Sequence, residues 1–260
     1  MAKKVLIVYA HQSSGSFDTA AKDAVVDILT AQGCRVEVSD LYAMAFKAAA
    51  TAKDVKGNLK SAENFCYLDE SKLSWEQGNL SDEITKEQSK LAEADLVIFQ
   101  FPMYWFSVPG ILKGWFDRVL TNGFAFSQEK PYILQTFKDK KAMLSFTTGS
   151  PESMFCTIGI NGDINVTLWP LQNGILHYCG FQVLPPEVFW APALTAAADR
   201  KKMLARWRTR LQDLLEEEPL SFTPLDRFDK ETFQLKDEHI SEEFGLSVGI
   251  HLSNPLPSQS

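Results

Sequence analysis

Runs of apolar residues separated by polar turns divide most of the chain into alternating strands and helices. Continuous apolar runs predict buried strands at residues 4–9, 34–38, 96–102, 141–148 and 180–184. Apolar positions spaced three or four residues apart predict helices at residues 17–32, 81–94, 109–120, 163–178 and 199–216. Five strands that alternate with helices predict an α/β fold built on a doubly wound, five-stranded parallel sheet.

The most informative stretch covers residues 96–120, LVIFQFPMYWFSVPGILKGWFDRVL. A proline ends its strand, and three aromatic residues, Tyr104, Trp105 and Phe106, follow before the next helix begins. Open α/β sheets bind their ligands at the carboxyl ends of the strands. Three adjacent rings cannot all point inward, so they either plug the edge of the sheet or form a wall for a flat ligand.

The helix at residues 109–120 carries two apolar stripes with Gly110 and Gly114 between them. This pattern predicts a helix that is covered on most sides, by the sheet and by a second subunit. Residues 41–78 lack a clear period and predict a loop-rich excursion with short helices.

The sequence changes character at Pro219. Prolines, isolated phenylalanines and charges replace the periodic pattern from there to Ser260. Residues 1–218 are therefore expected to form the main domain, and residues 219–260 an appendage. The appendage is too apolar for a free tail, so we expect it to pack on the body.

Composition excludes several classes of protein. A net charge of −7 over 260 residues argues against a nucleic-acid partner. No apolar run reaches the roughly 18 residues of a membrane-spanning helix, so no membrane partner is expected. Cys34, Cys66, Cys156 and Cys179 form no CxxC pair, which predicts free thiols. A strand begins at once after the first residues and leaves no targeting peptide, so a cytoplasmic protein is predicted.

The turn after the first strand favours a phosphate group. It lacks the G-x-G-x-x-G and G-x-x-x-x-G-K-[ST] motifs but offers His11, Ser13, Ser14 and Ser16 at the start of a helix. Hydroxyl and free amide N–H groups at a helix start can hold a phosphate, although a serine-rich capping turn explains the same residues. In the common strand order 2-1-3-4-5, this turn lies beside the aromatic turn and the TTGSPES turn after the fourth strand. Together the three turns describe a flavin site.

Four segments carry a resemblance to a known family: DLVIFQFPMYWFSVPGILKGWFDRV, LSFTTGS, WPLQNGILHYCGFQVL and FGLSVGIHL. They resemble the cytosolic NAD(P)H:quinone oxidoreductases of the DT-diaphorase type, and the resemblance spans essentially the whole chain. It implies a flavodoxin-like fold, an obligate homodimer and one non-covalent FAD per subunit. It also implies two-electron reduction of quinones by NAD(P)H through a ping-pong route, with donor and quinone using one pocket in turn.

The resemblance assigns roles to individual residues. The implied FAD-binding residues are His11, Phe17, Asp18, Cys66, Met103, Tyr104, Trp105, Phe106, Thr147, Thr148, Gly149, Ser150 and Arg200. The implied substrate-binding residues are Phe126, Ser127, Gln128, Met154, Tyr178 and Phe233. Phe126 and Gln128 are expected to reach the flavin of the partner subunit. The appendage is expected to lie near the donor site.

Several positions depart from the family pattern. Asp18 stands where the family has Asn, and a carboxylate beside a diphosphate is repulsive unless it turns away. Cys66 replaces a Gln. Phe155 and Asn161 occupy the catalytic positions that hold Tyr and His in the NAD(P)H-using branch, so we expect slower hydride transfer rather than none.

Two branches of the family are mixed in this chain. Tyr104, Phe126 and Asn161 resemble the branch that prefers dihydronicotinamide riboside, whereas residues 219–260 resemble the appendage of the NAD(P)H-using branch. The riboside branch has a metal site, but Asn173 and Phe222 replace two of its ligands and leave His177 alone, so no metal is expected. The alternatives to NAD(P)H:quinone reduction are a riboside-dependent quinone reductase, an FMN-carrying electron-transfer protein and a largely non-catalytic partner that stabilises other proteins.

Overall fold

The computed structural model describes residues 2–61, 63–127, 136–156 and 158–239. The strands are β1 (Lys4–Tyr9), β2 (Arg35–Asp40), β3 (Leu96–Pro102), β4 (Lys141–Thr147), β5 (Gln182–Val183) and β6 (Glu187–Phe189). The α-helices are α1 (Phe17–Ala31), α2 (Tyr67–Glu76), α3 (Asp82–Glu93), α4 (Gly110–Val119), α5 (Ile164–Leu171) and α6 (Ala197–Asp213).

The strands form one parallel sheet in the order β2-β1-β3-β4-β5, which confirms the predicted doubly wound topology. The fifth strand of the sheet is in two pieces: β5 pairs with the start of β4 at Lys141, and β6 pairs with its end at Thr147. Pro185 and Pro186 separate the two pieces, since proline cannot donate to the ladder.

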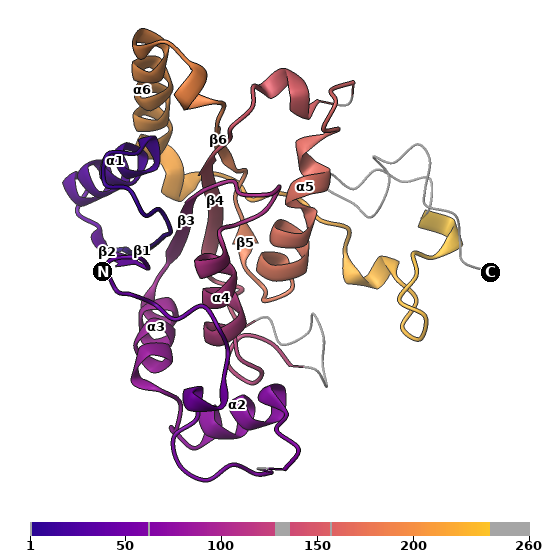
Figure 1. Cartoon of the computed structure of the whole chain (residues 1–260). Coiled ribbons are helices and arrows are strands. Elements are labelled where there is room, and N and C mark those ends of the chain that lie inside the picture. Colours follow the sequence, from indigo (N-terminus) through magenta and orange to yellow (C-terminus); the bar gives the residue numbers. More distant parts are fainter. Residues whose placement is uncertain (1, 62, 128–135, 157, 240–260) are drawn as a thin grey trace.

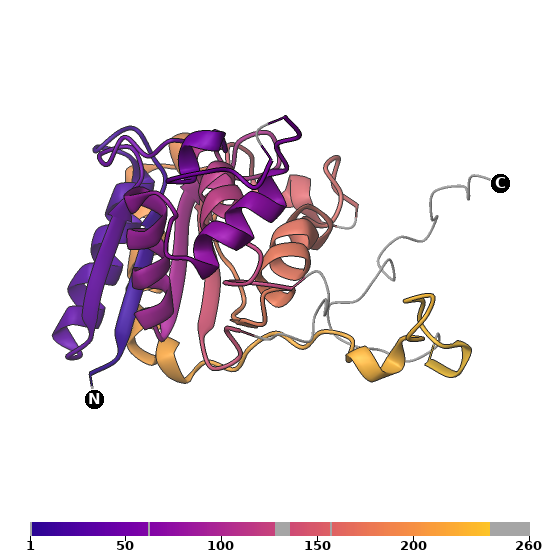
Figure 2. The same ribbon diagram turned by 90° about the horizontal axis from the view of Figure 1, so that it is seen from below.

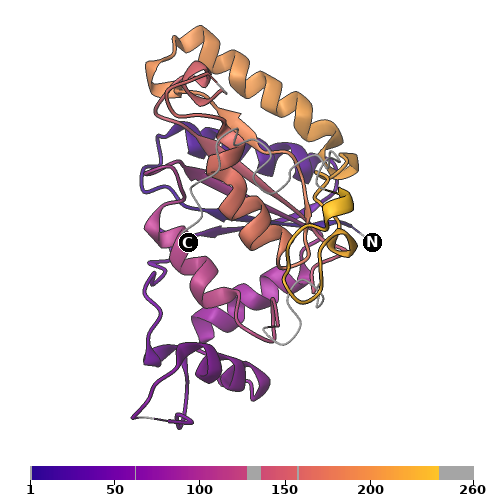
Figure 3. The same cartoon turned by 90° about the vertical axis from the view of Figure 1, so that its right-hand side faces the viewer.

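Helices cover both faces of the sheet (Figures 1 and 3). Helices α1 and α6 lie on one face, where Ile7 and Trp207 share a core. Helices α3, α4 and α5 lie on the other face, where Val8 and Trp115 share a second core. Neighbouring residues of β1 thus supply opposite cores, which explains why its apolar run is continuous. None of the described helices has the length and apolar character needed to cross a membrane.

The ends of the helices follow local sequence signals. Ser16 caps α1 by accepting a hydrogen bond from the Thr19 N–H, and Gly33 follows that helix with a φ of +85°. The helix expected at 163–178 is present, but α5 ends soon after Pro170 and continues as a π-helix over Gln172–His177. Proline lacks the N–H that a regular helix uses and crowds the preceding turn, which accounts for the change of pitch.

The excursion between β2 and α3 covers part of α4. A Cβ atom added to Gly114 would lie 2.2 Å from the Ala48 carbonyl oxygen, so the glycine admits another segment of the same chain. Buried Arg118 of α4 binds Asp54 of that segment through two guanidinium nitrogens, at 3.0 and 2.6 Å. These contacts fix the excursion to the body.

The segment after α6 begins on the body and then leaves it. Leu220 and Phe222 pack against the core on the α5 side, and the Phe222 ring stacks on His177 at 4.2 Å. Residues 224–239 extend away from the helical layers (Figure 2). Phe244, which the sequence places in the appendage, lies outside the described residues. The extent to which the whole appendage packs on the body stays a prediction.

Candidate active site

Three turns meet at the carboxyl edge of the sheet, as the strand order requires. They follow β1, β3 and β4, which are neighbours in that order. The Met103 N–H donates to the Thr147 carbonyl oxygen at 2.8 Å, and Gln12 Nε2 donates to the Tyr104 hydroxyl at 3.1 Å. The predicted juxtaposition of these three turns is therefore confirmed.

The turn after β1 presents free donors at the start of α1. The Ser13 N–H donates to His11 Nδ1 at 2.9 Å, which fixes the ring of His11 across the turn. Within the described residues, no hydrogen bond occupies the amide N–H groups of Ser14, Gly15 and Phe17. Such groups at a helix start favour an anion.

The turn after β3 exposes its aromatic rings. Trp105 is 96% exposed and Phe106 is 51% exposed, so neither ring plugs the sheet. Both residues have a positive φ, of +50° and +59°. Bulky residues rarely adopt this conformation, and such strain is concentrated at ligand sites. Two hydrogen bonds between the main chains of Tyr104 and Ser107 hold the turn in this shape.

The turn after β4 is held by its own hydroxyls. Thr148 Oγ1 donates to the Ser150 carbonyl oxygen at 2.8 Å and accepts from the Ala191 N–H at 3.1 Å. At Gly149 an added Cβ would meet nothing within 4 Å, so this part of the turn borders open space. Phe155 lies below, between Phe106 and Trp190, with ring centroids at 6.0 and 5.5 Å.

Asp18 points into the protein and away from the turn. It is 2% exposed and accepts from Gln100 Nε2 at 2.9 Å and Thr147 Oγ1 at 2.7 Å. Ser145 Oγ in turn donates to Gln100 Oε1 at 2.7 Å. Burial raises the pKa of Asp18 above its usual range, against the opposing effect of the hydrogen bonds from Thr147 and Gln100.

The remaining predicted residues lie on several other segments. Cys66 is exposed at the start of α2, and Arg200 of α6 donates to the Thr195 carbonyl oxygen in the segment between β6 and α6. Asn161 belongs to the loop after β4, where its N–H donates to the carbonyl oxygen of Met154. Phe233 is exposed on the projecting segment.

Phe126 and Tyr178 contact each other, with ring centroids 5.7 Å apart, at the opposite edge of the sheet. Phe126 and Ser127 follow the end of α4, which runs back from the carboxyl edge. Tyr178 comes just before β5, whose first residue pairs with the start of β4. Within one chain, the length of β4 separates them from the three turns. Gln128 lies outside the described residues.

Sequence reasoning missed Gln100, Ser145 and Trp190. Gln100 had a signal, because it is the single polar residue in the buried strand LVIFQFP. An amide at such a position needs a buried partner, and that partner is Asp18. Ser145 and Trp190 carry no comparable signal.

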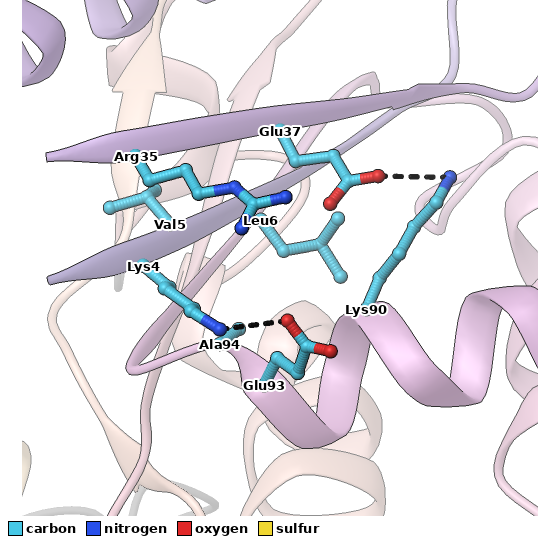
Figure 4. Close-up of a pocket in the computed structure, with 8 residues that line it drawn as sticks. All are labelled: Lys4, Val5, Leu6, Arg35, Glu37, Lys90, Glu93 and Ala94. Carbon is cyan, nitrogen blue, oxygen red and sulfur yellow. Dashed lines mark hydrogen bonds and ion pairs between the residues drawn. The ribbon is translucent and has the colours of Figure 1, made fainter.

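The opposite edge of the sheet also has a small hollow, between β1, β2 and α3 (Figure 4). Four of its charged side chains form two pairs: Lys4 binds Glu93 at 2.8 Å and Lys90 lies 3.8 Å from Glu37. These are ordinary solvated ion pairs, so this hollow offers no reactive group. In the described part of the chain, no three His, Cys, Asp or Glu side chains gather in a way that could hold a metal.

Comparison with known proteins identifies the family. A family model described as a flavodoxin-like fold matches residues 3–211. NAD(P)H dehydrogenase [quinone] 1 of Cavia porcellus is 47% identical over 99% of this chain and 96% of its own length. The chain belongs to the flavodoxin-like quinone oxidoreductases. A flavin as the cofactor class agrees with that fold.

Two further relatives extend the comparison. Ribosyldihydronicotinamide dehydrogenase [quinone] of Homo sapiens is 52% identical over 85% of this chain and 96% of its own length. A crystal structure of a proposed quinone reductase from Klebsiella pneumoniae superposes with a TM-score of 0.87 at 38% identity, covering 94% of this chain and 98% of the other. The family resemblance drawn from the sequence is confirmed, and so is its mixed character.

The three turns fit a flavin. Unoccupied amide N–H groups suit the phosphates, the open space at Gly149 leaves room for a ring edge, and the solvent-facing Trp105 offers a stacking surface. The individual roles of these residues remain proposals.

Proposed function

We propose that this protein reduces quinones with NAD(P)H in a two-electron, ping-pong reaction, with FAD held by the three turns at the carboxyl edge. One observation supports the location above all. Trp105 and Phe106 are held in a strained conformation that exposes their rings beside a turn with free amide N–H groups. Backbone strain of this kind is concentrated at ligand sites.

Each turn has its own task in this proposal. His11, Phe17 and Asp18 surround the helix start that holds the diphosphate, while Arg200 lies towards the adenine half. Met103, Tyr104, Trp105 and Phe106 form the wall for the flavin ring. The polar edge of that ring is hydrogen-bonded by Thr147, Thr148, Gly149 and Ser150. Cys66, which replaces a Gln, makes the weakest contact with FAD. FAD held there would supply hydride transfer from the nicotinamide donor to the quinone.

Phe155 and Asn161 occupy the catalytic positions, but their side chains lack the hydroxyl and the ionisable ring of the Tyr and His in the NAD(P)H-using branch. Phe155 is buried between two rings, so it shapes the floor of the site and cannot donate a proton. Asn161 can donate a hydrogen bond from its amide but carries no charge. The chain therefore relies on stacking and distance for hydride transfer, and Met154 lines the same loop.

A homodimer completes this site. Phe126, Ser127, Gln128 and Tyr178 are the substrate residues, yet Phe126 and Tyr178 lie at the far edge of their own subunit. They can serve a flavin site only across a subunit interface. We expect an interface larger than about 2,000 Å², as in obligate dimers. A stable, flavin-loaded monomer in sedimentation at micromolar concentration would contradict this.

The proposal places the protein in the cytoplasm, in keeping with its four free thiols. The first experiment is the absorption spectrum of the purified full-length protein. We expect a flavin spectrum that bleaches with NADH or NADPH and returns on addition of a quinone, and we expect the released cofactor to be FAD rather than FMN. A colourless protein that stays colourless with added FAD would favour a non-catalytic role.

Use of dihydronicotinamide riboside is the second candidate. The 52% identity to the human ribosyl enzyme favours it, as does the combination of Tyr104, Phe126 and Asn161. If dihydronicotinamide riboside bleaches the flavin spectrum of the full-length protein and NADH and NADPH do not, the second candidate is correct.

A further inference from the structure

Asp18 is a buried carboxylate at the start of α1 that accepts hydrogen bonds from Gln100 and Thr147. We propose that Asp18 is a positioning residue whose bound proton strengthens the grip of the β1–α1 turn on the diphosphate of FAD, so that the protein retains FAD less tightly as pH rises. This inference rests on the FAD site proposed above.

Asp18 is placed to sense the charge of a ligand at the helix start. It is the second residue of α1, and its carboxylate lies under the turn that offers the free amide N–H groups. His11 connects the two, because its Nε2 atom lies 4.0 Å from Asp18 Oδ2. Because His11 Nδ1 accepts from the Ser13 N–H, Nε2 is the nitrogen that directs a ring proton towards the carboxylate.

Within the described residues, no lysine or arginine pairs with Asp18, and the basic group set against it is His11. From β3 and β4 it meets the neutral Gln100 and Thr147, and β6 presents the Phe189 ring to Phe17. On α1, Lys22 pairs with Asp23. On α6, Arg208 pairs with Asp27, about two and a half turns along α1 from Asp18. His11 is the one titratable group set against the carboxylate.

A diphosphate at the turn therefore adds negative charge beside a buried carboxylate. In this low-dielectric place the repulsion favours the protonated form of Asp18, so its pKa is higher with FAD bound than without it. Burial already raises the pKa of Asp18 in the free protein. By linkage, FAD binding takes up protons, and affinity falls as pH rises between the two pKa values.

Protonation also changes the hydrogen bonding of Thr147. The ionised carboxylate accepts the Thr147 hydroxyl hydrogen on Oδ2. A protonated Oδ2 donates to Thr147 Oγ1 instead, and this leaves the threonine hydrogen free to point towards the site. Oδ1 still accepts from Gln100 in both states. An asparagine at this position matches the protonated state at every pH.

Release of FAD from the loaded full-length protein tests this directly. The protein and its Asp18→Asn variant are diluted in buffers from pH 5 to pH 8, and the fluorescence of free FAD gives the dissociation constant. We expect the constant of the parent to rise by about tenfold for each pH unit at most, the limit for one linked proton. Asp18→Asn should hold FAD at high pH as tightly as the parent does at low pH.

Two controls accompany that measurement. Asp23→Asn removes an exposed carboxylate from the same helix, and it should keep the pH dependence of the parent. Riboflavin has no phosphate, so its affinity should not follow the same profile. Calorimetric titration of the flavin-stripped parent in two buffers of different ionisation enthalpy should show proton uptake with FAD, and this needs no variant.

The outcomes separate the two proposals. Equal pH dependence in the parent and Asp18→Asn, or the absence of proton uptake, would overturn the role of Asp18 and leave the FAD site intact. Failure of both proteins to bind FAD at any pH would overturn the FAD site and this inference with it.

Discussion

Asp18 and Asp54 are both almost fully buried, at 2% and 3% exposure, yet their pKa values move in opposite directions. Asp18 lies at the carboxyl edge among neutral amide and hydroxyl donors, and burial raises its pKa. Burial acts on Asp54 in the same sense, but hydrogen bonds from Arg118 and Tyr67 outweigh it and lower the pKa. Burial alone therefore does not decide the charge of a carboxylate; its partners do.

The two regions use their carboxylates differently. Around Asp54, Arg118 also binds Glu83 and the Lys47 carbonyl oxygen, so Arg118, Asp54 and Glu83 all have a charged partner. This cluster attaches the excursion between β2 and α3 to α4. Around Asp18, no described lysine or arginine pairs with the carboxylate, and only His11 lies against it, which leaves it able to respond to a ligand. A fully paired cluster fixes structure, whereas a partly compensated charge can serve function.

The largest effect is expected from Arg118→Met. The change leaves Asp54 and Glu83 without their cation inside the protein, so the free energy of unfolding should fall by about 3–5 kcal/mol. Urea denaturation measures it, and the double variant Arg118→Met with Asp54→Asn should recover part of the loss. A loss as small as that of an exposed pair, Lys113→Met on the same helix, would remove the contrast between the two regions.

Trp105→Ala should have the next largest effect, on ligand binding alone. Its ring is exposed, so the apoprotein should keep its stability, while FAD binding should weaken by about 1–3 kcal/mol through lost apolar contact. Fluorescence titration with FAD measures the affinity and denaturation measures stability. Unchanged FAD affinity would mean that the flavin ring does not stack on Trp105.

The stability of the protein in acid should depend on Asp54. The folded-state pKa of Asp54 is below its unfolded value, so its contribution to stability is complete above the ordinary Asp range and is lost as pH falls through the folded pKa. The folded-state pKa of Asp18 is instead above its unfolded value, so the contribution of Asp18 to stability is lost as pH rises through that raised pKa. Denaturation between about pH 2 and pH 5 should therefore show a shallower acid slope in Asp54→Asn, by up to about 1.4 kcal/mol per pH unit.

The smallest effect is expected from truncation after Thr223. Residues 224–239 project from the body and no described contact joins them to either carboxylate (Figure 2). Stability and FAD affinity should then stay unchanged, while KM for NADH and NADPH rises and KM for dihydronicotinamide riboside does not. Keeping Leu220 and Phe222 preserves their packing on the core. Equal changes with all three donors would assign the segment to dimer support.

Local patterns predicted most of the scaffold. The five strand regions, the cap at Ser16 and the turn at Gly33 follow from neighbouring residues, because apolar runs and caps act over a few positions. The order of the sheet was predicted from the common order of doubly wound sheets. The same reasoning placed the aromatic turn at the edge where ligands bind. It also showed that three adjacent rings could not all be buried, and Trp105 is indeed exposed.

The tertiary structure decided what touches what. The sequence identified Asp18 as unusual, but only the fold shows that it turns inward to residues 82 and 129 positions away. Likewise, the partner of Arg118 lies 64 residues from it, in an excursion without periodic pattern. Charge, burial and pKa depend on distances across the fold, and no local pattern records those distances. The sequence thus determined where the turns are, and packing determined which of their side chains can hold a proton.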